Sequence, residues 1–141
     1  TPSGAQDLAD ALARGTGLPM EEATQILRTR GLAATEAAEY QGAAGPFGGT
    51  VRTLVDGIRN SIAFYASTSA SAPVTTVVLS GGGAFVPGLG QAIASTTRMR
   101  TVLGNPLEGV RVSKQLKDSD VLRGREATLA MTLGLGMGVA A

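Results

Sequence analysis

The segment that most constrains the fold is a short apolar run that leads into three consecutive glycines. Residues Val74–Leu79 are β-branched and too apolar for a strand with one buried face. This composition predicts a strand buried on both faces, as in a parallel sheet. Gly81, Gly82 and Gly83 then turn the chain, and Pro87 opens a helix. The segment therefore predicts an α/β fold.

Further helices and one more strand are predicted around this segment. Apolar spacings of three and four predict helices over residues 3–14, 19–30 and 51–66, with a weak helix over 34–40 followed by a loop to residue 50. A short strand is predicted over residues 101–103. Since two strands make a poor sheet, further strands or a partner are expected to complete it.

The C-terminal segment Ala127–Ala141 carries no charged residue and predicts a buried, closely packed helix. Its 15 residues fall short of the roughly 20 that a membrane-spanning helix needs. The N-terminus has no basic segment followed by an apolar run, so no signal peptide is predicted.

Composition excludes several classes of function. The chain of 141 residues is 43% hydrophobic and 16% charged, with a net charge of +1, which is typical of one globular domain. The scattered basic residues argue against nucleic-acid binding. The absence of Cys and His excludes disulfides, zinc sites of the usual kind and triads with an imidazole base.

The glycine turn is the candidate ligand site. Glycines allow close backbone approach, and the N-terminus of the following helix favours an anion such as a nucleotide. A tight turn without a ligand is the better-supported interpretation for a glycine cluster alone. The segment is not a P-loop, a Gly-x-Gly-x-x-Gly fingerprint or a nucleophile elbow, because the required Lys and Gly positions hold other residues.

Six segments carry family information: Gly4–Leu8, Ile58–Tyr65, Val77–Ala84, Val86–Leu89, Gly104–Leu107 and Ala127–Gly136. In this order along the chain they resemble the C-terminal half of the PilM family of type IV pilus assembly proteins. The Ser-Gly-Gly-Gly turn is shared with other actin-like ATPases, whereas the Ile-Arg-Asn-Ser-Ile-Ala-Phe-Tyr and Gly-Asn-Pro pieces are more specific to PilM.

This resemblance implies the C-terminal lobe of an actin-like, ribonuclease H-like ATPase fold, with an incomplete sheet flanked by helices. Residues 1–66 would form a helical subdomain resembling IIB, and residues 67–141 the α/β part of subdomain IIA with an adenosine-type glycine turn. The implied function is a scaffold at the cytoplasmic face of the inner membrane. The implied partners are a PilN-like inner-membrane protein and the pilus motor ATPases, and self-association stays open.

The resemblance also implies an ATP or ADP site with Mg. Gly81, Gly82, Gly83 and Ala84 would lie against the adenosine, and Phe85 would either stack on the base or pack the turn. Gly4 and Arg28 complete the implied nucleotide contacts. Relatives carry Glu and Lys where this chain has Thr24 and Leu27, which predicts weaker binding of the ribose.

No carboxylate is placed to act as a general base, so no catalytic or metal-binding residue is assigned and catalysis by this chain alone is not expected. One alternative is an active ATPase of the pilus or type II secretion platform, completed by groups outside this chain. A second is an FtsA-like cell-division filament protein, which predicts a basic amphipathic tail where this chain has Met137–Ala141. A third is an unrelated small-molecule-binding α/β domain.

Overall fold

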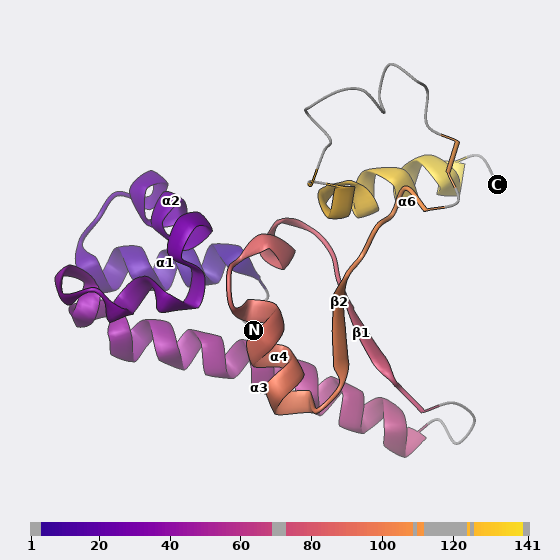
Figure 1. The fold of residues 1–141 in the computed structure, drawn as a ribbon, viewed down its shortest axis with the longest axis horizontal. Coiled ribbons are helices and arrows are strands. Elements are labelled where there is room, and N and C mark those ends of the chain that lie inside the picture. The colour runs from indigo at the N-terminus through magenta and orange to yellow at the C-terminus, as the bar shows by residue number, and fades with distance from the viewer. Residues whose placement is uncertain (1–3, 69–72, 109, 112–123, 125, 140–141) are drawn as a thin grey trace.

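The computed structural model describes residues 4–68, 73–108, 110–111, 124 and 126–139 (Figure 1). The elements combine a helical N-terminal part with a small strand-containing part. In order they are α1 (Ala5–Thr16), α2 (Met20–Arg30), the 3₁₀ helices η1 (Gly31–Glu36) and η2 (Ala38–Ala43), α3 (Ala44–Thr68), β1 (Thr76–Leu79), η3 (Gly82–Phe85), α4 (Leu89–Thr97), β2 (Arg100–Leu103), η4 (Glu126–Leu129) and α6 (Ala130–Val139).

The helical part is organised around α1, which packs on α2, η2 and α3. Leu8 and Leu12 are fully buried on its inner face, as the predicted apolar spacing requires. Gly15 lies where η2 crosses, since an added Cβ would come 2.5 Å from the Cα of Ala43. Close approach of the two backbones therefore depends on this glycine.

Two predictions about residues 31–50 are wrong. The weak helix over 34–40 is replaced by the 3₁₀ helices η1 and η2, and the predicted loop instead contains the start of α3. Pro46 is tolerated because the first-turn N–H groups of a helix have no intrahelical acceptor. Phe47 is only 2% exposed, so burial of its ring favours the helix despite the neighbouring glycines.

The sheet among the described residues consists of β1 and β2, which are parallel, with Thr76 opposite Arg100 and Leu79 opposite Leu103. Helix α4 connects them and covers one face, where Leu79 lies close to Gly90. The opposite face is open, and Val78 is 61% exposed. The expectation that both faces of this strand are buried is therefore wrong for the described part of the chain.

The C-terminal helix α6 is also more exposed than predicted. Met131, Leu135 and Met137 are 78%, 68% and 65% exposed, and α6 packs chiefly on the adjoining η4. Its apolar composition was correctly read as a helix, but the described elements leave its surface uncovered. No helix within the described residues combines the length and hydropathy that a membrane crossing requires.

Candidate functional site

The glycine turn after β1 is held in place by backbone hydrogen bonds on both sides. Gly81 has φ 78°, a conformation that favours glycine, and its N–H donates to the carbonyl oxygen of Ala127 at 2.8 Å. Its own carbonyl accepts a hydrogen bond from Ala84 N–H at 3.2 Å. Residues 82–85 form η3, and buried Val86 follows. Because the Gly81 N–H is already bonded, it is not available to a ligand.

A cavity of about 380 Å³ lies at the carboxyl end of β1, the position at which ligands bind in many open α/β sheets. It is formed by the start of α1, the middle of α3, the end of β1, η3 and α4. The residues that line it are Gly4, Ala5, Leu54, Ile58, Val78, Leu79, Ser80, Gly83, Ala84, Leu89 and Ile93.

The start of α1 and the glycine turn lie side by side at this cavity. A Cβ added to Gly83 would lie 3.6 Å from the Cβ and 3.7 Å from the N of Ala5, which is ordinary van der Waals contact. Gly4 precedes α1, and its N–H donates to Oδ2 of Asp7 at 3.1 Å. Segments about 80 residues apart along the chain are thus brought to one site.

The structure separates the sequence-predicted contacts into two groups. Gly4, Gly83 and Ala84 line the cavity. The others stand outside its lining: Gly81 and Gly82 belong to the turn itself, Phe85 is half-buried at the end of η3, and Arg28 is exposed on α2. No contact of Arg28 with the cavity is seen, and a nucleotide role for these residues stays a prediction.

The helix that the resemblance implicated presents no charged group at its two distinctive positions. Leu27 is 2% exposed and belongs to the core of the helical part. Thr24 donates its hydroxyl hydrogen to the carbonyl of Met20 at 2.8 Å, one turn earlier in the same helix. Leu27 therefore has a packing role in this chain, and a charged side chain there would have to be buried or turned outward.

The cavity floor was not predicted as part of a site. Leu54, Ile58, Leu89 and Ile93 were recognised only as apolar helix positions, because apolar periodicity predicts burial without showing which buried residues border a cavity. Knowledge of the crossing of α3 and α4 is needed to place them. No sequence signal distinguishes them from other core residues.

The chemistry of the lining favours an apolar, flat group over a phosphate chain. Among the described residues, no charged side chain lines the cavity, and Ser80 supplies the one side-chain hydroxyl. Within the described part of the chain, no group of three or more Asp, Glu, His or Cys side chains could hold a metal ion. The described residues thus fit the base and ribose end of a nucleotide, whereas phosphates and Mg would need other groups.

Comparisons with known proteins give a family and a fold. The model of the family described as type IV pilus assembly protein PilM matches residues 2–139. A solved structure titled "PilM-PilN type IV pilus biogenesis complex" is similar at a TM-score of 0.72 and 23% sequence identity, over 93% of this chain and 35% of that one. This chain thus spans about a third of that chain's length. Among curated proteins, no significant match is found.

Proposed function

The chain belongs to the type IV pilus assembly protein PilM family, and from this premise we propose that it is a nucleotide-facing part of an actin-like scaffold in the pilus assembly machinery. Residues 1–66 would form the helical subdomain of the second lobe, and residues 67–141 its strand-containing subdomain. The scaffold would lie in the cytoplasm against the inner membrane. Family membership and the similar solved structure support this assignment of the fold.

The cavity beneath the glycine turn carries the proposal. It lies where the two proposed subdomains meet, with Ala5 and Ile58 on one side and Gly83 and Ala84 on the other. An adenine ring would enter an apolar space lined by α3 and α4, against the backbone of η3. ADP or ATP with Mg is the proposed ligand, with its phosphates and metal held by groups outside these residues.

The proposed partner is a PilN-like inner-membrane protein, because the similar solved structure is titled as a complex of PilM with PilN. Contacts with that partner and with the motor ATPases are assigned mainly to parts of the longer relative that this chain does not match. The role we propose is structural, since none of the described residues that line the cavity carries a carboxylate to activate a water. Magnesium-dependent phosphate release by the full-length protein would instead support an active ATPase.

The test is calorimetric titration of Mg-ADP and Mg-ATP into the full-length protein and two glycine variants. Gly83→Leu adds a side chain at the cavity lining, where its Cβ meets Ala5 at ordinary van der Waals distance, and is expected to weaken binding by about tenfold or more, or ~1.4 kcal/mol. Gly57→Leu is the matched control, because Gly57 is exposed, lies outside the lining and has no heavy atom within 4 Å of an added Cβ. Equal weakening in both variants, or no nucleotide binding by folded wild type, would contradict the proposed site.

A further inference from the structure

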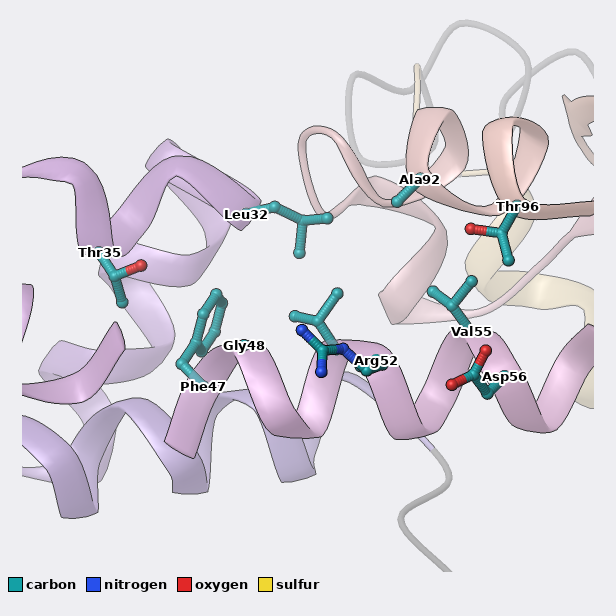
Figure 2. Close-up of a pocket in the computed structure, with 10 residues that line it drawn as sticks. Leu32, Thr35, Phe47, Gly48, Arg52, Val55, Asp56, Ala92 and Thr96 are labelled. Atoms are coloured by element: carbon teal, nitrogen blue, oxygen red, sulfur yellow. The ribbon is translucent and has the colours of Figure 1, made fainter. Parts of the chain in front are cut away.

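A second cavity, of about 310 Å³, lies on another face of α3 and shares no lining residue with the cavity at the glycine turn. Figure 2 shows Phe47, Gly48, Arg52, Val55 and Asp56 along α3, facing η1 and α4 across a gap. Consecutive α3 residues such as Leu54 and Val55 therefore serve different cavities, about 100° apart around the helix.

The floor of this cavity is apolar and firmly packed. Phe47 and Val55 are 2% and 5% exposed, and Leu32 and Ala92 pack against the same core from η1 and α4. A volume of about 310 Å³ is at the low end of the range of roughly 300–1,000 Å³ for small-molecule sites. This volume accommodates one bulky apolar side chain.

The mouth of the cavity carries two charges of opposite sign. Arg52 and Asp56 are one turn apart on α3, and Figure 2 shows both on the side of the helix that borders the gap. Neither side chain forms a hydrogen bond or ion pair with another described residue. An apolar pocket with a charged rim has the anatomy of a protein–protein contact, in which Arg is enriched.

Gly48 keeps the mouth open without serving the packing of the chain. It is exposed and lies inside α3, where glycine costs roughly 1 kcal/mol relative to alanine. No heavy atom lies within 4 Å of the position a Cβ would take, so the fold does not require glycine there. Glycine at this position lets a partner approach the helix backbone.

We propose that this cavity is a docking site for a segment of another protein that inserts one bulky apolar side chain, flanked by an acidic residue opposite Arg52 and a basic residue opposite Asp56. The apolar side chain would bury itself against Phe47 and Val55. The two flanking charges set the direction in which the segment lies along α3, because the reverse direction places like charges together.

The probe is a set of synthetic peptides in which a single Leu, Ile or Phe is flanked by one Asp and one Lys, in both orders and at several spacings. Binding to the full-length protein is measured by fluorescence polarisation. We expect one order to be preferred, and Gly48→Leu to weaken its binding by about tenfold or more by filling the mouth. Gly49→Leu is the matched control, because Gly49 is also open but lines neither cavity.

Exchange of the two charges gives a readout that a structural effect would not produce. The double variant Arg52→Asp, Asp56→Arg is expected to prefer the opposite peptide order. Equal binding of all peptides to wild type and Gly48→Leu, or an unchanged order preference in the exchanged variant, would overturn the proposal. So would a shift from dimer to monomer in sedimentation of Gly48→Leu, because the occupant would then be a second copy of the chain.

Discussion

Gly31 is the residue at which the helical part meets the loop between η3 and α4. It ends α2 with φ 60° and ψ −134°, a backbone conformation that other residues rarely adopt. Its Cα faces Pro87 so closely that an added Cβ would overlap the Pro87 carbonyl. The same carbonyl accepts a hydrogen bond from Leu32 N–H at 2.9 Å. Both the backbone conformation and the contact therefore require glycine.

Gly31→Ala is expected to lower the free energy of unfolding by about 3 kcal/mol, from backbone strain and displacement of Pro87. Urea denaturation of the variant and wild type measures the loss. Gly49→Ala is the control, because Gly49 is helical, has nothing within 4 Å, and is expected to gain roughly 0.5–1 kcal/mol as alanine. A Gly31→Ala protein as stable as wild type would contradict this account.

Sequence analysis identified some residue roles and missed others for a definable reason. The helix predicted over residues 19–30 does end just before Gly31, and Gly81 was correctly predicted to turn the chain, because both features depend on local backbone conformation. The contact of Gly31 with Pro87 joins residues 56 positions apart and has no local signature. Burial of Leu27, which gives that position a packing role, likewise depends on how α2 packs on α1.

At the scale of elements, α2 and η2 are joined by a small charged cluster. Arg30 at the end of α2 lies 3.9 Å from a carboxylate oxygen of Glu39, and its Cζ lies 5.6 Å from the centre of the Tyr40 ring. The side chains of this ion pair are 49% and 60% exposed, so the pair contributes little to stability. The same Glu39 raises the pKa of Tyr40, first through a hydrogen bond and also through its charge, whereas Arg30 lowers it.

Because the pKa of Tyr40 is raised in the folded state, the folded chain keeps the phenolic proton of Tyr40 just above pH 10, where the unfolded chain loses it. This contribution to stability is present below about pH 10 and is lost as the pH rises through the folded pKa. Glu39→Gln is expected to lower the pKa of Tyr40 toward its ordinary value. Tyrosinate absorbance measures it in a Tyr65→Phe background, since the chain has two tyrosines.

Glu36→Gln is the control for this titration, because Glu36 is not among the groups that act on Tyr40. An unchanged midpoint in Glu39→Gln would show that Glu39 does not hold the proton on Tyr40. Denaturation at rising pH gives the second readout, in which the wild type should lose stability above pH 10 more steeply than the Glu39→Gln variant.

The presence of a helix was predictable where apolar residues recur at helical spacing. The residues at which a helix begins, and the exposure of its surface, were not. The stripe through Val51, Leu54, Val55 and Ile58 correctly predicted α3, yet its first turns contain a Gly-Pro-Phe-Gly-Gly sequence typical of a loop. Tertiary burial of Phe47 outweighs that local preference. Conversely, α6 was expected to be buried because it is apolar, but composition does not supply a neighbouring element to cover it.

At the scale of the whole molecule, burial is unevenly distributed between the two parts. Helix α1 buries Leu8, Ala9, Ala11 and Leu12 almost completely. By contrast, the sheet in the described part of the chain has two strands, β1 and β2, with Val78 and Leu103 61% and 51% exposed, and α6 is largely exposed. Two strands alone are marginally stable in water. The helical part should therefore be the more stable unit of the chain.

Hydrogen exchange of the isolated chain tests this difference. Amides of α1 are expected to exchange slowest, and those of β1 and β2 about tenfold faster or more, since local opening of the sheet exposes little buried apolar surface. Equal protection of strands and α1 would show that further strands extend the sheet in solution. Such strands could come from a second copy of the chain or from the same chain. Dilution distinguishes the two, because strands paired with a second copy lose protection at low concentration, whereas strands from the same chain keep it.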